Sequence, residues 1–131
     1  MTATCACGGI SITLSSGPRF QAVCHCTDCK RRTGSAFGIS LYFARDAVTE
    51  VIGETAVYAF RHRTQDQEQE RHFCKRCGTT LYWFISTMPD KIGVAGGCFG
   101  EQALPEPGMS VSDGKRKPWV TLPSAWKVHE G

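Results

Sequence analysis

Seven of the eight cysteines of this chain stand in short motifs with the spacing of metal ligands. The motifs are a C-x-C pair, a C-x-C-x-x-C triplet and a C-x-x-C pair, made by Cys5 and Cys7, by Cys24, Cys26 and Cys29, and by Cys74 and Cys77. Thiolates are common zinc ligands, and a purely structural zinc ion takes four protein ligands in a closed tetrahedron. The triplet supplies only three, which raises the question of a fourth ligand.

The length and composition indicate one domain, which we place at residues 1–131 as a single zinc-binding unit. A chain of 131 residues with 41% hydrophobic residues can bury a core without disulfide bonds. Its first residues, MTATCACGGISITL, do not resemble a secretory signal, and no run of 18 apolar residues occurs. We therefore expect a cytoplasmic protein with no membrane partner. In that reducing compartment the cysteines are better explained as metal ligands than as disulfides, although an oxidising compartment would permit disulfides.

The formal net charge of +3 gives little support for a nucleic-acid partner. This charge assumes neutral thiols, whereas seven thiolates holding two zinc ions would bring it to about zero. Bulk electrostatics then offers no reason to expect binding to a polyanion, and no nucleic-acid partner is predicted. The oligomeric state is not evident from the sequence.

The distribution of β-branched and aromatic residues predicts a mainly β domain with antiparallel strands. Runs of such residues alternate with turn signals at residues 9–14, 19–24, 36–44, 55–60, 79–86 and 91–97. The aromatic run at residues 81–84, which contains Tyr82 and Trp83, fits a core strand. Helical periodicity is weak, and one or two turns are expected within residues 27–34. Residues 63–71 have no apolar stripe and fit a loop or a strand edge, and the tail after residue 105 is expected to be irregular, anchored by Trp119 and Trp126.

The cysteines divide most simply into a group of four and a group of three. Cys74 and Cys77 form a knuckle on a tight turn, and Gly78 after them allows a positive φ. Once the triplet is kept together, Cys5 and Cys7 remain to complete a tetrahedral site with this knuckle. Such a site would tie the N-terminal segment to the middle of the chain. The chief alternative pairs Cys5 and Cys7 with two members of the triplet.

Several motifs resemble the glutathione-dependent formaldehyde-activating enzyme family, whose relatives include centromere protein V. They are CACGG, CHCTDCKRRTGSAFG, RHFCKRCGTTLY and KPWVTLP, which occur in this order over nearly the whole chain. The resemblance implies a tent-like fold of small antiparallel sheets built around two zinc sites. By this resemblance, Cys5, Cys7, Cys74 and Cys77 hold a structural zinc ion, whereas Cys24, Cys26 and Cys29 hold a catalytic one. The fourth position of the catalytic ion is then left for water or a substrate atom.

The resemblance also implies a reaction between a thiol and a small aldehyde. Glutathione and formaldehyde would combine to S-hydroxymethylglutathione, a carbon–sulfur bond formation classed with the lyases. Zinc on three thiolates is a weak Lewis acid but can bind and orient a sulfur or a small oxygen ligand. The basic run Lys30, Arg31 and Arg32 follows the triplet and is predicted to offset its negative charge or to bind the carboxylates of glutathione. For each of the three, a solvated turn is the alternative.

Two other functions remain open for the same motifs, and three further residues have undecided roles. The alternatives are a noncatalytic zinc module that binds a protein, and a thiol-based metal or redox sensor. Cys98 is expected to be a small buried hydrophobe, with a fourth zinc ligand or a pocket thiol as alternatives. His25 is expected to turn away from the ion toward the surface or to lie behind the ligands. His62 is expected to be structural or solvated, with proton transfer as an alternative.

Overall fold

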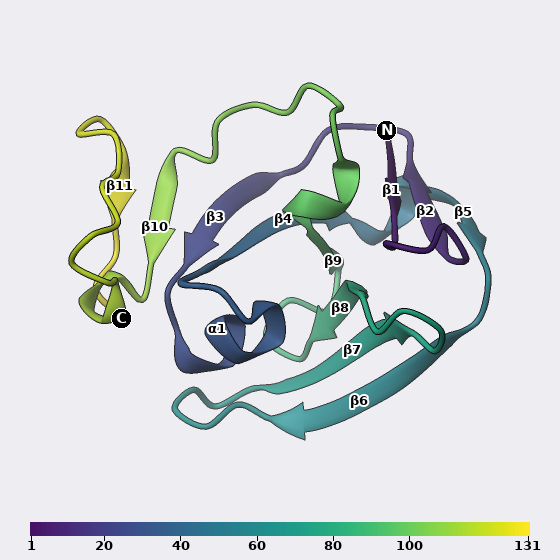
Figure 1. The fold of residues 1–131 in the computed structure, drawn as a ribbon, viewed down its shortest axis with the longest axis horizontal. Coiled ribbons are helices and arrows are strands. Elements are labelled where there is room, and N and C mark those ends of the chain that lie inside the picture. Colours follow the sequence, from purple (N-terminus) through teal and green to yellow (C-terminus); the bar gives the residue numbers. More distant parts are fainter.

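The protein consists mainly of short β-strands, as the computed structural model of residues 1–131 shows (Figure 1). One α-helix, α1 (Thr27–Thr33), and three 3-10 turns, η1 (Arg45–Ala47), η2 (Gly96–Phe99) and η3 (Asp113–Lys115), interrupt them. The strands are β1 (Thr2–Thr4), β2 (Ser11–Leu14), β3 (Phe20–Cys24), β4 (Gly38–Ala44), β5 (Val48–Ile52), β6 (Thr55–Arg61), β7 (Glu68–Cys74), β8 (Thr80–Ile85), β9 (Lys91–Ala95), β10 (Met109–Val111) and β11 (Lys127–Val128).

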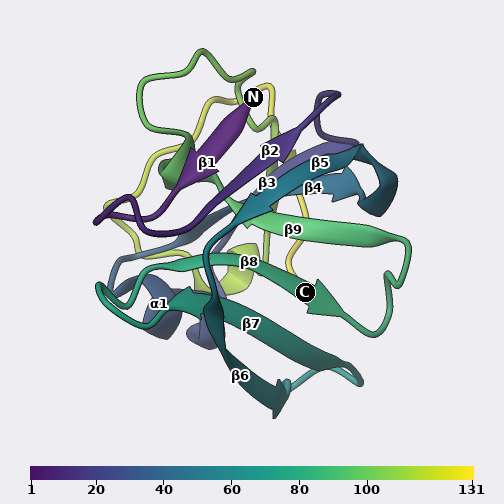
Figure 2. The same cartoon turned by 90° about the vertical axis from the view of Figure 1, so that its right-hand side faces the viewer.

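The strands form two sheets. A small sheet has the order β1-β2-β5, and a large sheet of eight strands has the order β11-β10-β3-β4-β9-β8-β7-β6. Figure 2 shows the small sheet above β9, β8, β7 and β6. All pairs are antiparallel except those of β10, which runs parallel to β3 and to β11. The predicted mainly β fold is confirmed, with one sheet larger than expected and a parallel edge formed by the tail.

Alternating burial explains why the predicted apolar runs become strands. In β2, for example, Ile12 and Leu14 are buried whereas Ser11 and Thr13 are only half-buried, as expected when successive side chains point to opposite faces. All six predicted runs contain a strand of the structure. The main core lies between the sheets and joins Ala3, Ile12 and Leu14 of the small sheet to Leu41, Phe43, Leu81 and Val94 of the large one. The aromatic run is a core strand, as predicted, with Tyr82 and Trp83 buried.

Helix α1 lies where one or two helical turns were expected, between β3 and β4. Cys26 is its N-cap, and Gly34 ends it with a φ of 66°, a left-handed conformation that glycine adopts without strain. With seven residues, α1 is too short to cross a membrane, and the chain has no longer α-helix. Residues 63–71 form a loop that runs into β7, which agrees with the expected loop or strand edge.

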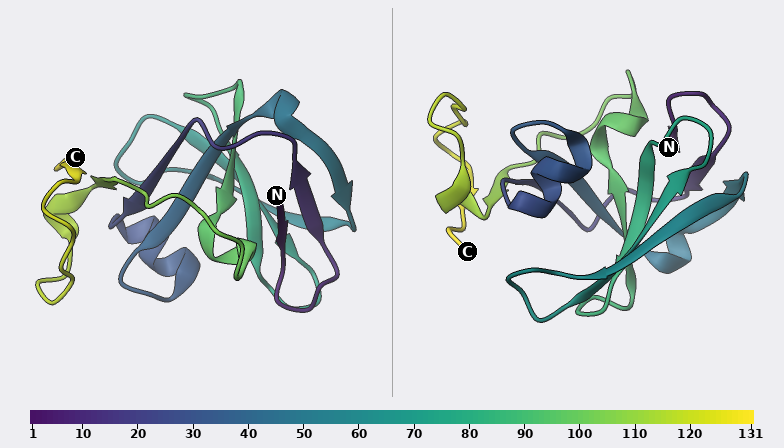
Figure 3. Two further views of the ribbon diagram at one scale, coloured as in Figure 1. Left: turned by 90° about the horizontal axis from the view of Figure 1, so that it is seen from above. Right: turned by 60° about the horizontal axis from the view of Figure 1, so that its bottom comes forward.

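The tail adds β10 and β11 to the large sheet and extends beyond α1 at one end of the molecule (Figure 3). The expectation that Trp119 anchors this tail is wrong, because its side chain is 73% exposed. The neighbouring Val120 is buried instead, and its carbonyl accepts a hydrogen bond of 2.7 Å from Arg116. Trp126 is half-buried. The anchor is therefore an aliphatic side chain next to the tryptophan that the sequence suggested.

Candidate metal centres

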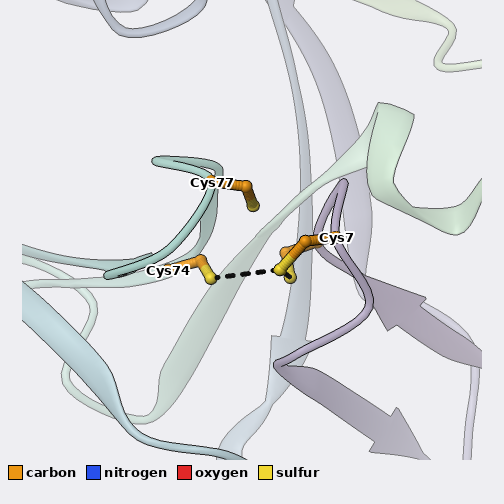
Figure 4. A group of neighbouring side chains, drawn as sticks. Cys7, Cys74 and Cys77 are labelled. Carbon is orange, nitrogen blue, oxygen red and sulfur yellow. Dashed lines mark hydrogen bonds between the residues drawn. The ribbon is translucent and has the colours of Figure 1, made fainter.

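Four cysteines from two distant segments meet where the two sheets come together, and Figure 4 shows three of them, Cys7, Cys74 and Cys77. The sulfurs of Cys5, Cys7, Cys74 and Cys77 all lie within 4.8 Å of one another. The Sγ of Cys7 lies 3.7 Å from that of Cys5 and 3.6 Å from that of Cys74. Tetrahedral zinc with bonds of about 2.3 Å separates its sulfur ligands by about 3.8 Å. The four sulfurs therefore have the spacing of a closed metal site, and the partition into four and three is the one that the structure contains.

Two similar turns present these four sulfurs. After Cys5, Gly8 has a φ of 81° and its amide donates to the Cys5 carbonyl, whereas after Cys74, Gly78 has a φ of 79° and its amide donates to the Cys74 carbonyl. The amide of Ile10 also donates to the Cys5 sulfur at 3.3 Å. Backbone donors of this kind stabilise sulfur in its thiolate form.

The triplet forms where β3 ends and α1 begins. Cys24 ends β3, Cys26 caps α1, and Cys29 lies in the first turn of the helix. Their sulfurs also lie within 4.8 Å of one another. The Cys29 amide donates a hydrogen bond of 3.3 Å to the Cys26 sulfur, which is how this side chain caps the helix. The strand-to-helix turn thus brings three thiols together by local geometry alone.

Crowding of these thiols drives their pKa values apart. Hydrogen bonds from Cys24 and Cys29 lower the pKa of Cys26 strongly, whereas the interactions with Cys24 and Cys26, together with burial, raise the pKa of Cys29. Protein groups alone thus favour one thiolate at a time. A soft cation between the sulfurs would allow all three to ionise, so the donor set fits a thiophilic metal such as zinc.

The triplet opens onto a cavity of about 450 Å³. The cavity is lined by both apolar and amide side chains, among them Phe20, Tyr42, Gln65, Gln67, Gln69 and Ile85. Tyr42 accepts a hydrogen bond of 3.3 Å from the indole N–H of Trp83, so its own hydroxyl proton is free for another acceptor. Burial raises the pKa of Tyr42, which keeps this hydroxyl protonated at neutral pH.

His62 also lines this cavity, and it is buried rather than solvated. Its Nδ1 faces the backbone amides of Thr64 and Gln65 at 3.2 and 3.1 Å, so Nδ1 is the acceptor and Nε2 carries the proton of the neutral ring. A hydrogen bond from His62 contributes to the lowered pKa of Cys26. His62 therefore has the structural one of the two roles expected for it, next to the triplet, and it is not solvated. Proton transfer by His62 stays a prediction.

A buried carboxylate holds His62 and the next residue in place. Asp28 on α1 accepts hydrogen bonds of 3.0 and 2.7 Å from Arg63, and its other oxygen lies 3.4 Å from Nε2 of His62. Burial alone would raise the pKa of Asp28, but the hydrogen bonds from Arg63, together with the charges of Arg63 and His62, keep this pKa below its usual value. The carboxylate therefore stays ionised and ties the loop before β7 to α1.

The three basic residues after the triplet do not enter its cavity. The ammonium of Lys30 donates to the Lys115 carbonyl at 2.6 Å, and the Arg32 guanidinium lies 4.4 Å from the centre of the Trp83 ring. Arg31 is exposed and, like Arg32, lines a different pocket. Successive residues of a helix point about 100° apart, so three in a row cannot face one site. Their predicted contact with glutathione stays a prediction, and the structure does not bring them to the triplet.

Cys98 and His25 lie apart from both clusters. Cys98 is on η2, is half-buried against the core and belongs to neither group of sulfurs, so it does not close the triplet as a fourth ligand. His25 has no exposed surface and contacts Phe37 with its ring, which excludes the expected surface position. Burial lowers the pKa of His25, so its ring is neutral at pH 7.

Sequence reasoning did not single out Tyr42 on the wall of the cavity or Asp28 beside His62. Tyr42 reaches the cavity through the pairing of β3 with β4, and Asp28 reaches His62 from α1. One signal was available in the glutamines at 65, 67 and 69, which lie in the segment without an apolar stripe. All three line the cavity, although only Gln69 lies on β7 and the other two lie in the loop before it.

Comparisons with known proteins concern the fold and the family of this chain. The crystal structure of a Rhodobacter sphaeroides protein superimposes with a TM-score of 0.60 at 24% sequence identity, over 79% of this chain and 91% of that one, and shares the fold. A Halomonas elongata protein named "Putative glutathione-dependent formaldehyde-activating enzyme" is 28% identical over 93 residues. These cover 68% of this chain and 59% of the relative, so the chain spans less than two thirds of that protein's length.

The family assignment rests on a longer match. The family model described as "Glutathione-dependent formaldehyde-activating enzyme" matches residues 1–112, a range that contains both cysteine clusters. The chain therefore belongs to the glutathione-dependent formaldehyde-activating enzyme family.

Proposed function

We propose that this chain is a zinc-dependent enzyme of the carbon–sulfur lyase type that joins glutathione, or a similar thiol, to formaldehyde or a similar small aldehyde. One observation carries the proposal: three cysteine sulfurs converge and also line a cavity of about 450 Å³. A noncatalytic module needs no such cavity, and Cys98 does not take the fourth ligand position. The proposal includes a cytoplasmic setting, since all eight cysteines are free thiols, and one zinc-binding domain over residues 1–131.

In this proposal Cys24, Cys26 and Cys29 hold the catalytic zinc ion, and the four-cysteine cluster holds a structural one. When bound at the triplet, zinc supplies a position for a sulfur or oxygen atom of a reactant. The thiol sulfur forms a bond to the carbonyl carbon, the carbonyl π electrons move to oxygen, and the thiol proton is balanced by the proton that this oxygen gains. No oxidant or further reactant is required.

The chain's own groups supply orientation and a proton donor. The free hydroxyl proton of Tyr42 is available to the aldehyde oxygen, on which negative charge develops during addition. The amides of Gln65, Gln67 and Gln69 line the same cavity and offer donors and acceptors to the peptide groups of a glutathione-like thiol. His62, whose Nε2 lies 3.4 Å from Asp28, donates to Cys26 and so helps to fix the orientation of this ligand.

The Tyr42→Phe variant tests this function. Loss of one hydroxyl donor to the developing oxyanion is expected to slow catalysed exchange between free glutathione and S-hydroxymethylglutathione about tenfold or more. Exchange NMR at equilibrium measures this rate, because the uncatalysed addition makes product formation alone uninformative. Tyr58→Phe is the matched control, since Tyr58 is exposed on β6 and does not line the cavity. Wild-type protein that neither accelerates exchange nor binds glutathione by calorimetry would remove glutathione as the substrate.

Removal of the metal should occur in two steps. Four thiolates outcompete three for zinc, so a moderate chelator is expected to strip the triplet ion while the four-cysteine cluster keeps its own. Zinc content by elemental analysis should fall from two ions per chain to one with the circular dichroism spectrum unchanged. A starting content of one ion, or simultaneous loss of both with unfolding, would contradict the two-site proposal.

A further inference from the structure

A second pocket, of about 520 Å³, is lined by four arginines. Arg31 and Arg32 come from α1, Arg63 from the loop before β7, and Arg71 from β7 itself. Asp28 is the one acidic residue in its lining. We call this site the arginine pocket. Four guanidinium groups and one carboxylate leave three positive charges around one hollow, and like charges gathered in this way repel one another unless an anion lies between them.

Arg71 is the central member, because it is buried and unpaired. Only 8% of its surface is exposed, and no salt bridge of the chain involves it. Its guanidinium lies 4.6 Å from the centre of the Phe60 ring, a cation–π contact that compensates only part of the lost hydration. Burial and the nearby Arg32 both lower the pKa of Arg71, and the negative charges of Cys29, Asp28 and Cys26 offset them only in part. The charged side chain thus lines a pocket without a direct ion pair to any group of this chain.

Arg32 is in a similar position. Its Nη2 atom is buried and has no hydrogen-bond partner, although its guanidinium stacks on Trp83. Trp83 and Arg71 are opposite each other in the pairing of β8 with β7. The two arginines therefore converge on one patch of the sheet, and each has N–H donors to spare. A buried donor without a partner is rare in folded proteins and requires an explanation, and the Nη2 of Arg32 is such a donor.

Negative groups of the protein do not fully neutralise the four arginines of this pocket. Asp28 is engaged by two hydrogen bonds from Arg63 and by its contact with His62. Three thiolates with one divalent ion at the triplet would carry one net negative charge, which still leaves two positive charges unbalanced. Arg31 and Arg63 are exposed and can be hydrated, so the positive charge that no protein group balances lies on Arg32 and Arg71.

We propose that the arginine pocket binds an oxyanion, the carboxylate or phosphate group of a small molecule. Guanidinium groups present two parallel N–H donors that match the oxygens of either group. The arginine pocket borders the triplet cavity. Asp28 contacts both His62, which lines the triplet cavity, and Arg63, which lines the arginine pocket. The proposal requires no catalysis at the triplet and stands or falls independently of the lyase function.

Calorimetric titration with inorganic phosphate and with succinate, at constant ionic strength, tests this site. Both probes are expected to saturate on the wild-type chain, and Arg71→Gln should weaken binding at least tenfold. Arg61→Gln is the matched control, because Arg61 is an exposed arginine of β6 that pairs with Asp66 and lies outside the arginine pocket. Arg32→Gln serves as a second variant, which keeps the test valid if Arg71→Gln fails to fold.

The two probes also distinguish the sources of the anion. Saturation by phosphate alone would assign the site to phosphate esters, and saturation by succinate alone would assign it to carboxylates. Binding that weakens as salt is added, in the wild type but not in the variants, would support direct charge pairing. Wild-type protein that binds neither probe would overturn the proposal, as would arginine variants that bind as tightly as the wild type.

Discussion

The Cys74→Ser variant is expected to unfold or aggregate. Cys74 ends β7 of the large sheet, and its sulfur lies 3.6 Å from that of Cys7, which follows β1 of the small sheet. In the proposed structural site, this contact is a metal link between the two sheets. Structural zinc contributes about 10–16 kcal/mol in small domains, whereas whole domains are stable by only about 5–15 kcal/mol. Loss of one zinc ligand is therefore expected to remove a large part of the free energy of unfolding.

Thermal unfolding followed by circular dichroism checks this expectation. A loss of about 3 kcal/mol or more would lower the unfolding midpoint by about 10 °C or more in a chain of this size. Cys98→Ser is the matched control, since it makes the same chemical change at a half-buried cysteine outside both clusters. Equal shifts in the two variants would mean that the four-cysteine cluster holds no structural ion.

The Cys26→Ser variant is expected to fold normally, to lose one of two zinc ions and to exchange the glutathione adduct no faster than buffer. The fold survives because serine is a favoured N-cap, so its hydroxyl can accept the Cys29 amide bond that the Cys26 sulfur now accepts. Zinc binding fails because a neutral hydroxyl replaces one of only three thiolates. The Cys26→Ser substitution thus removes the zinc ligand and keeps the cap of the helix.

Three measurements on one preparation decide the outcome for Cys26→Ser. Elemental analysis should give one zinc ion per chain, the unfolding midpoint should stay within about 5 °C of wild type, and exchange NMR should return the uncatalysed rate. Unfolding as severe as that of Cys74→Ser would make the triplet a structural site and would remove the main physical support for an enzyme. Full exchange activity with one ion would place the chemistry elsewhere.

The elements that could be predicted from the sequence are those set by local chemistry. The cysteine spacing, the glycine after the C-x-x-C knuckle and the period-2 apolar runs each act over a few residues, and the structure agrees with all three. The cavity was not predictable in the same way, because Tyr42 and Gln67 meet only after strands far apart in the sequence pair. The parallel pairing of β10 with β3 likewise depends on tertiary packing, and no turn motif in the sequence predicts it.

Basic residues and tryptophans were the least predictable side chains. A run such as Lys30, Arg31 and Arg32 has a clear charge but no clear direction, since each step along a helix turns the side chain by about 100°. Trp119 was expected to anchor the tail, yet it is exposed and the neighbouring Val120 is buried instead. Arg71 is the converse case: nothing in its sequence context signals burial, and its position on the inner face of β7 decides it.

The link between Cys7 and Cys74 also orders the events of biosynthesis. About 70 residues separate Cys7 from Cys77, so at about 5–20 residues per second a ribosome needs roughly 4–14 seconds between them. Throughout that interval the first two thiols have no partners, and β1 and β2 lack the complete sheet on which they will pack. With the proposed structural ion, the nascent chain would have to keep its earliest cysteines reduced until the knuckle has left the exit tunnel, and the N-terminal segment would be the last part of the small sheet to be fixed in place.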